Sequence, residues 1–314
     1  MFLYLYLKNL DICNPYLLNE ISNLVSKKSN FNNFSRIIAL QNSNKKGIVS
    51  NFSVYFQTLG KFNIYVDKKD IPVEIMTKYK KPIYLLKLLL TYRRSGLPRD
   101  VICDKIWKGY STKSSKNNLN TTISRLRKIF NKKKNIIITD GDIIILNREV
   151  YRLDVDEFVD YYNEGNGLEK MNRFKDALQA FLNAISIYKG DFLPNDLYDD
   201  DIEAERERLK NIYQNSLLKI TKIYLGIENY LNAISYAKIL INKDPLCEAA
   251  YRLLMIASAL SGNRSEIPKI FNNLAIKLTK YLNIDPDPKT IQLKEKLLSG
   301  IVPSPKMWEQ EIFI

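Results

Sequence analysis

A change in the spacing of apolar residues constrains this chain more than any other feature. In "FSVYFQ", apolar residues alternate with Ser53, Tyr55 and Gln57, and "FNIYV" repeats the alternation after the turn "TLG". This period of two is typical of strands with one buried face. After a second turn, "DKKD", residues 71–75 ("IPVEI") are expected to form a third short strand. From residue 82 the apolar spacing becomes three or four, which is typical of amphipathic helices.

Three helices and a hairpin are expected to follow the strands. "KPIYLLKLLLTYRR" carries a proline suited to a first helical turn, and "RDVICDKIW" gives a second helix after the break "GLP". The third helix covers residues 117–130, and Ser114 or Ser115 is expected to be its N-cap. Asp140-Gly141 between "IIIT" and "IIIL" predicts a β-hairpin. This order of elements predicts an α+β winged helix-turn-helix domain.

From about residue 156 onward, the sequence predicts an all-α repeat domain. Ala233 lies twelve residues before Pro245, the spacing of the small residue and the proline in a tetratricopeptide repeat. Ile267 follows Ala233 by thirty-four residues, which is the length of one such repeat. We expect stacked helical hairpins that bind a protein partner.

Two pairs of opposite charge lie at helical spacing in "DDDIEAERERLKNIYQ", namely Glu203 with Arg206 and Glu205 with Arg208. Pairs at i,i+3 on a helix surface each contribute only tenths of a kcal/mol. Both are therefore expected to be minor surface interactions.

The third helix of the winged helix has an apolar side and a polar side. At about 100° per residue, its apolar positions fall within roughly 60° of one another; they are Leu119, Ile123, Leu126 and Phe130. The polar side is our candidate recognition surface, and it consists of Asn117, Thr121, Ser124, Arg125 and Lys128. Asn and Arg can form bidentate hydrogen bonds to adenine and guanine edges, and Lys and Thr can bind phosphates. The alternative is an ordinary solvated face on a structural helix.

Further lysines near this helix are candidates for contacts with the DNA backbone. Lys113 and Lys116 precede the residues that face outward, and Lys132, Lys133 and Lys134 follow the helix directly. Arg127 lies off the polar side, so it is expected to pair within the protein or to touch a phosphate.

The distribution of charge favours a polyanion as partner. The chain has a formal net charge of +14, and residues 51–150 carry 21 basic and 8 acidic side chains, a net charge of +13. A bias toward Lys across the genome would not confine the excess to one segment, so this segment is expected to bind nucleic acid.

Several classes of function are disfavoured by what the sequence lacks. It has no histidine, no Walker loop and no GxGxxG motif, so we expect no enzyme, no cofactor and no metal site. It has no apolar run long enough to span a membrane, and "MFLYLYLKNL" lacks the features of a signal peptide. Its three distant cysteines fit a reducing compartment. We therefore expect a cytoplasmic protein associated with the nucleoid.

Several stretches resemble a known family. "LLKLLLTYRRSGLPRDVICDKIWKG" and "LNTTISRLRKIF" resemble the winged helix of OmpR-type response regulators. "YRLDVDEFVDYYNEG" and "YKGDFLPNDLYDDDIEAERERL" resemble the bacterial transcriptional activator domain. Together they resemble the streptomycete antibiotic regulatory proteins and their relatives, over roughly residues 52–299.

The resemblance implies a transcription activator that binds direct repeats near promoters and recruits RNA polymerase. It also implies that the third helix enters the major groove of double-stranded DNA, and that the loop from Trp107 to Lys116 can face the polymerase. Whether the protein forms a homodimer on DNA is left open.

The resemblance and the patterns together give an expected domain organisation. Residues 1–50 form an unassigned N-terminal extension, 51–154 the winged helix-turn-helix domain, 155–300 the activator domain and 301–314 a C-terminal tail. Two other functions remain as alternatives: an interaction scaffold whose basic winged helix binds an acidic partner, and a protein that binds nucleic acid without sequence preference.

Overall fold

The computed structural model describes residues 53–130, 135–197 and 199–302. Contacts divide the described chain into two compact units. The first contains the residues up to Phe56 and Ile64–Arg152, and the second contains Gln57–Asn63 and the residues from Leu153 onward. Residues 57–63 lie inside the range expected for the winged helix, yet they belong to the second unit. The N-terminal extension, residues 1–50, lies outside the described residues.

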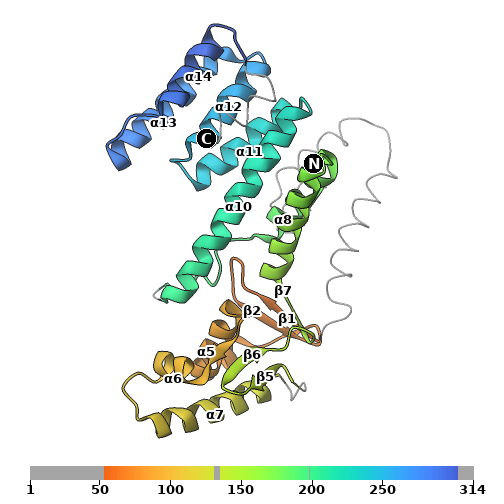
Figure 1. Cartoon of the computed structure of the whole chain (residues 1–314), viewed down its shortest axis with the longest axis vertical. Coiled ribbons are helices and arrows are strands. Elements are labelled where there is room, and N and C mark those ends of the chain that lie inside the picture. Colours follow the sequence, from red (N-terminus) through yellow and green to blue (C-terminus); the bar gives the residue numbers. More distant parts are fainter. Residues whose placement is uncertain (1–52, 131–134, 198, 303–314) are drawn as a thin grey trace. The chain divides into compact units, whose positions relative to one another are not determined.

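Two small sheets form part of the first unit (Figure 1). Their strand orders are β3-β2-β1-β7 and β4-β6-β5. The strands are β1 (Val54–Gln57), β2 (Asn63–Val66), β3 (Lys69–Asp70), β4 (Leu97–Pro98), β5 (Ile137–Asp140), β6 (Ile143–Leu146) and β7 (Tyr151–Leu153). The antiparallel pair β5–β6 is the predicted hairpin. Its turn is Gly141-Asp142, one residue later than expected, and Gly141 has φ +56°.

In the described part of the first unit there are four helices: α4 (Val73–Lys78), α5 (Lys80–Thr91), α6 (Arg99–Ile106) and α7 (Thr112–Ile129). Helix α7 packs against α5 and α6. Phe56 of β1 joins sheet to helix, because its ring meets Phe130 edge-on at 5.9 Å and Tyr151 at 5.3 Å. Three helices ending in a hairpin that pairs with β4 confirm the predicted winged helix-turn-helix fold.

Two local expectations in this unit are wrong. Residues 71–75 do not form a strand, because Pro72 caps the short helix α4, which starts at Val73. The third strand is Lys69–Asp70 instead. Helix α7 begins before Ser114 and Ser115, since its N-cap is Ser111, whose hydroxyl accepts a hydrogen bond from the backbone N–H of Ser114 at 3.4 Å.

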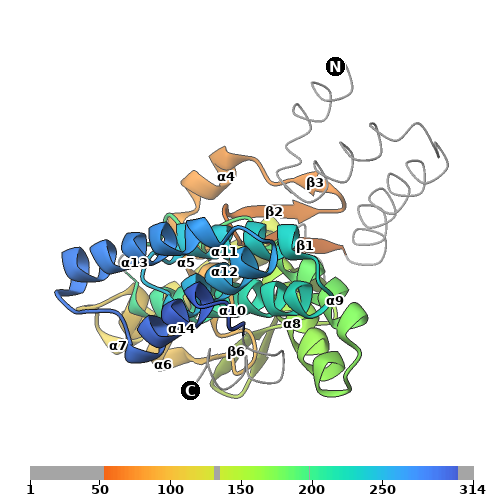
Figure 2. The same ribbon diagram turned by 90° about the horizontal axis from the view of Figure 1, so that it is seen from above.

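Among the residues that the structure describes, the second unit has seven helices: α8 (Asp154–Lys170), α9 (Phe174–Ile187), α10 (Asp200–Gly226), α11 (Tyr230–Lys243), α12 (Glu248–Leu260), α13 (Ile267–Leu282) and α14 (Pro288–Leu298). A 3-10 turn, Arg264–Glu266, precedes α13. Each helix packs against the next along the chain (Figures 1 and 2). Ala233 and Ile267, the two positions in repeat register, are both fully buried. The predicted all-α helical domain is therefore present.

A buried carboxylate joins residues 57–63 to this helical unit. Asp154, the first residue of α8, is 2% exposed. Its Oδ2 accepts hydrogen bonds from the backbone N–H groups of Thr58 (2.7 Å) and Leu59 (2.8 Å). Its Oδ1 accepts from the Thr58 hydroxyl (2.7 Å) and the Val155 N–H (2.9 Å). Burial raises the pKa of Asp154, and these four donors oppose that rise.

The same segment lies against the loop between α9 and α10. Gly60 N–H donates to Asp191 O at 2.9 Å, and Leu193 N–H donates to Thr58 O at 2.9 Å. Gly60 (φ +83°) and Gly190 (φ +154°) approach so closely that a Cβ on Gly190 would lie 2.9 Å from Gly60 Cα. Only glycine fits this close approach of two backbones.

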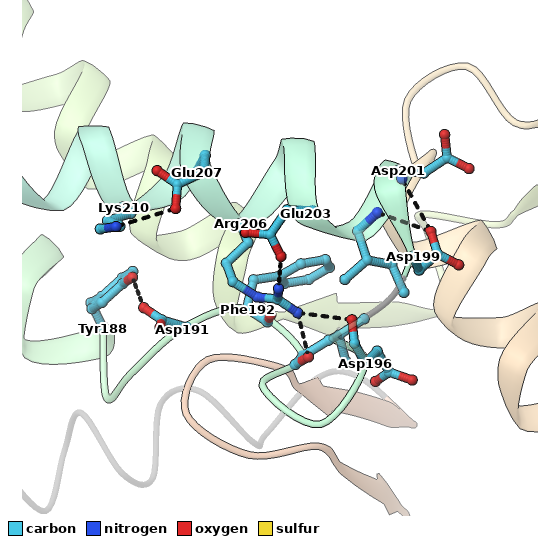
Figure 3. A network of polar contacts seen from close by, with 12 residues as sticks. Tyr188, Asp191, Phe192, Asp196, Asp199, Asp201, Glu203, Arg206, Glu207 and Lys210 are labelled. Atoms are coloured by element: carbon cyan, nitrogen blue, oxygen red, sulfur yellow. Dashed lines mark hydrogen bonds and ion pairs between the residues drawn. The ribbon is translucent and has the colours of Figure 1, made fainter.

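Arg206 of α10 organises the other side of that loop (Figure 3). Its guanidinium donates to the carbonyl oxygens of Phe192 (2.9 Å), Leu193 (2.9 Å) and Asp196 (3.1 Å), and it pairs with Glu203. Arg206 is 6% exposed, so the expectation of a minor surface pair is wrong at this position. The other pair, Glu205 with Arg208, is bidentate, and the side chain of its arginine is 44% exposed.

Asp154→Asn is expected to lower the free energy of unfolding by about 3 kcal/mol. The amide NH2 would face a backbone or hydroxyl donor, and a buried hydrogen-bonding group left unsatisfied costs about 1–3 kcal/mol. Urea unfolding followed by circular dichroism measures the change. Asp160→Asn, an exposed carboxylate on the same helix, is the control and should cost less than about 0.5 kcal/mol. Equal stability of the two variants would contradict the role given to Asp154.

Arg206→Met is expected to cost about 3 kcal/mol, because it leaves three loop carbonyls without their shared donor. Arg206→Lys should recover only part of this loss, since an ammonium has three donors and no planar fork. Thermal and urea unfolding measure both variants. Arg208→Met is the matched control, and a loss as large as that of Arg206→Met would show that burial of Arg206 adds nothing.

Candidate nucleic-acid interface

Helix α7 is held by its apolar stripe. Leu119 and Leu126 are fully buried, and Ile123 is 4% exposed. Phe130, the C-cap of the helix, is also fully buried. This confirms the predicted stripe and fixes which side of α7 faces outward.

The five candidate recognition residues all lie on exposed positions of α7. They are Asn117, Thr121, Ser124, Arg125 and Lys128. At about 100° per residue, they cover one face roughly opposite to the buried stripe. The helix carries five basic and no acidic side chains, so no carboxylate of its own opposes a phosphate there.

Some polar groups on this surface already have partners. The Thr121 hydroxyl donates to Asn117 O at 3.1 Å. In this orientation its oxygen can only accept a hydrogen bond from a ligand; it could donate one only after the hydroxyl rotates. Lys116 pairs with Asp100 of α6 at 3.3 Å, with both side chains at least half exposed. Lys113 is exposed on the first turn of α7. Lys132, Lys133 and Lys134 lie outside the described residues.

Arg127 pairs within the protein, which is one of the two roles expected for it. Its Nη2 donates to the carbonyl oxygen of Ile137 in β5 at 3.1 Å. The bond joins the C-terminal turn of α7 to the hairpin that forms the wing. Arg127 therefore fixes the wing relative to the helix.

Sequence reasoning missed two residues of this surface, Arg99 and Asn120. Arg99 is the first residue of α6, and its Nη1 donates to Asn120 Oδ1 on α7 at 3.0 Å. The Arg99 N–H also donates to Asp142 O in the turn of the wing at 2.8 Å. Twenty-one positions separate the two side chains, so no local pattern links them. The helical angle alone would have placed Asn120 beside Ser124 on the outward side.

The cysteine of α6 is a structural side chain. Burial raises the pKa of the Cys103 thiol, and the nearby carboxylates of Asp100 and Asp104 raise it further. The thiol therefore stays protonated at neutral pH. Within the described ranges, no group of His, Cys, Asp or Glu side chains could hold a metal ion. None of the helices in that part of the chain is long and apolar enough to cross a membrane.

Two family models match separate segments of this chain. Residues 153–298 match the family described as bacterial transcriptional activator domain, and residues 76–142 match the one described as transcriptional regulatory protein, C terminal. Each match covers less than half of the chain, so each shows only what its own segment is similar to. The second match runs from within α4 to the turn after β5, so it contains every candidate residue. Both families are transcription regulators and not enzymes, and OmpR-type winged helices bind DNA.

One solved structure agrees with this chain at the level of the fold. EmbR of Mycobacterium tuberculosis, in complex with a low-affinity phosphopeptide, is similar with a TM-score of 0.71 and 18% identity, over 82% of this chain and 68% of that chain. The C-terminal TPR-containing domain of a Plasmodium falciparum FK506-binding protein has a TM-score of only 0.35 at 20% identity, over 47% of this chain and 89% of that one, and carries no argument. None of the curated proteins compared with this chain matches it significantly.

Proposed function

We propose that this protein is a sequence-specific transcription activator that binds promoter direct repeats and recruits RNA polymerase. The outward face of α7 carries the proposal, because it presents amide, hydroxyl and guanidinium groups on a helix whose opposite side is buried. These groups can distinguish base edges in the major groove. In this proposal Asn117, Thr121, Ser124, Arg125 and Lys128 meet the bases or flanking phosphates.

The contacts with the DNA backbone divide between two segments. Lys113 and Lys116 would meet phosphates on one side of the groove, and Lys132, Lys133 and Lys134 on the side of the wing. Two copies on a direct repeat would bind half-sites about one helical turn apart, roughly 10–10.5 base pairs. In this proposal the protein is cytoplasmic and associated with the nucleoid. The domain boundaries of 51–154 and 155–300, with flanking segments 1–50 and 301–314, belong to the same proposal.

Fluorescence anisotropy on two labelled duplexes tests the function. One duplex is the region upstream of the gene for this protein, and the other is a scrambled copy, each titrated over a salt series. We expect a preference of a hundredfold or more at physiological salt, and specific regulators typically reach about 10³–10⁷-fold over non-specific DNA. Equal and salt-sensitive binding to both would support a nucleic-acid protein without sequence preference. Absence of binding to either would favour the interaction scaffold.

Two alanine substitutions separate base reading from phosphate binding. Arg125→Ala should weaken the preferred duplex by about 1–3 kcal/mol and relax the preference at one base position. Lys113→Ala should weaken all duplexes about equally and lower the slope of log K against log salt by about 1. The same measurement on Lys133→Ala should resemble Lys113→Ala. If Arg125→Ala and Lys113→Ala behave alike, the division of roles is wrong.

A further inference from the structure

Arg99 and Asn120 form a cross-helix pair at the edge of the candidate surface, on the side of Ser124. The backbone of Arg99 is held by the wing, through its hydrogen bond to Asp142 O and through the pairing of Pro98 with Ile143. Its guanidinium reaches across to Asn120 at 3.0 Å. Asn120 is exposed and Arg99 is half-buried, so the pair is open to a ligand on its outer side.

The chemistry of the pair fixes the orientation of the Asn120 side chain. A guanidinium has five N–H donors and no acceptor, so the atom of the carboxamide that faces it must be the oxygen. The Nδ2 group, with its two donors, therefore points away from Arg99. The second lone pair of Asn120 Oδ1 lies beside the N–H groups of the Arg99 guanidinium. The amino group of a base that approached this lone pair would therefore face other N–H donors.

Asn120 therefore differs from an asparagine that can turn either edge to a base. An unrestrained asparagine reads adenine with both edges, accepting from N6 and donating to N7. Held by Arg99, Asn120 presents donors, and the remaining guanidinium N–H groups of Arg99 add more donors beside it. Guanine is the base that offers two acceptors, N7 and O6, in the major groove.

We infer that Arg99 and Asn120 act as one unit that selects guanine at a single position of the operator, with Asn120 in contact with the base and Arg99 as its positioning residue. On the helical projection, Asn120 lies about 40° from Ser124 and about 60° from Asn117, both already on the outward face. The inference rests on the proposed function, because it names a specificity determinant of the same surface.

Selection from a pool of random duplexes by the full chain gives the preferred sequence, and anisotropy then measures all four bases at each position at one salt concentration. The wild-type protein should prefer guanine over adenine by about tenfold or more at one position. Asn120→Asp keeps a partner for Arg99 but presents an acceptor, so the preference at that position should move to cytosine, whose N4 is a donor.

Variants at position 99 test whether Arg99 acts through Asn120. Arg99→Met removes the donors, and the preference at that same position should fall to within about threefold. Arg99→Lys retains a donor and should keep more of the preference. A role in stability alone would lower affinity for every duplex and leave the base preference unchanged. Circular dichroism confirms that each variant is folded.

A matched variant controls for added charge. Asn118→Asp places the same negative charge on the same helix, about 160° away around its axis. It should leave the selected sequence unchanged. If the wild-type protein selects a sequence but Asn120→Asp leaves the preference at every position as it was, the pair does not read a base and the inference is overturned alone. If the wild-type protein selects no sequence, the proposed function fails and this inference fails with it.

Discussion

The carboxylate of Asp154 is the constraint on which the architecture depends. It follows β7 directly and begins α8, so it lies where the chain leaves the sheet for the helices. A buried carboxylate is costly unless hydrogen bonds satisfy it, and residues 58–59 supply three of the four donors. The segment between β1 and β2 thus belongs to the helical unit, although the strands on either side belong mainly to the first unit.

A second buried charge stabilises the loop that receives this segment. Arg206 donates to three carbonyl oxygens of the loop, and the loop in turn bonds Thr58 and Gly60 through its backbone. Tyr188 at the start of the loop donates to Asp191 at 2.9 Å, and burial together with this bond raises the pKa of Tyr188 above its usual value. The two buried charges are therefore satisfied mostly by backbone groups of irregular segments, which gives those segments one defined conformation.

The order of the elements could be predicted from the sequence, because it depends on periodicity and turn chemistry. The stripe on α7 and the hairpin after it follow from residues a few positions apart. The strand predicted at residues 71–75 was wrong, because an alternation over five residues fits the first turn of a helix as well as a short strand. Pro72 also favours the start of a helix. The burial of Arg206 could not be predicted, because its partners are carbonyl groups 10 to 14 residues earlier and carry no sequence signal.

The same limit applies to the candidate surface. Helical spacing places side chains on the outward face of α7, but it does not reveal which of them are already engaged.

These existing contacts bear on how the surface would meet DNA. Lys116 would have to give up its ion pair with Asp100, or keep it while it also binds a phosphate. Its net contribution to the affinity for DNA should therefore be smaller than that of Lys113. Arg127 is committed to Ile137 O and contributes by fixing the wing. Arg99 and Asn120 are ordered before binding, which reduces the side-chain entropy that binding must overcome. Specificity is thus expected from groups that the protein has already oriented, and affinity from exposed lysines such as Lys113.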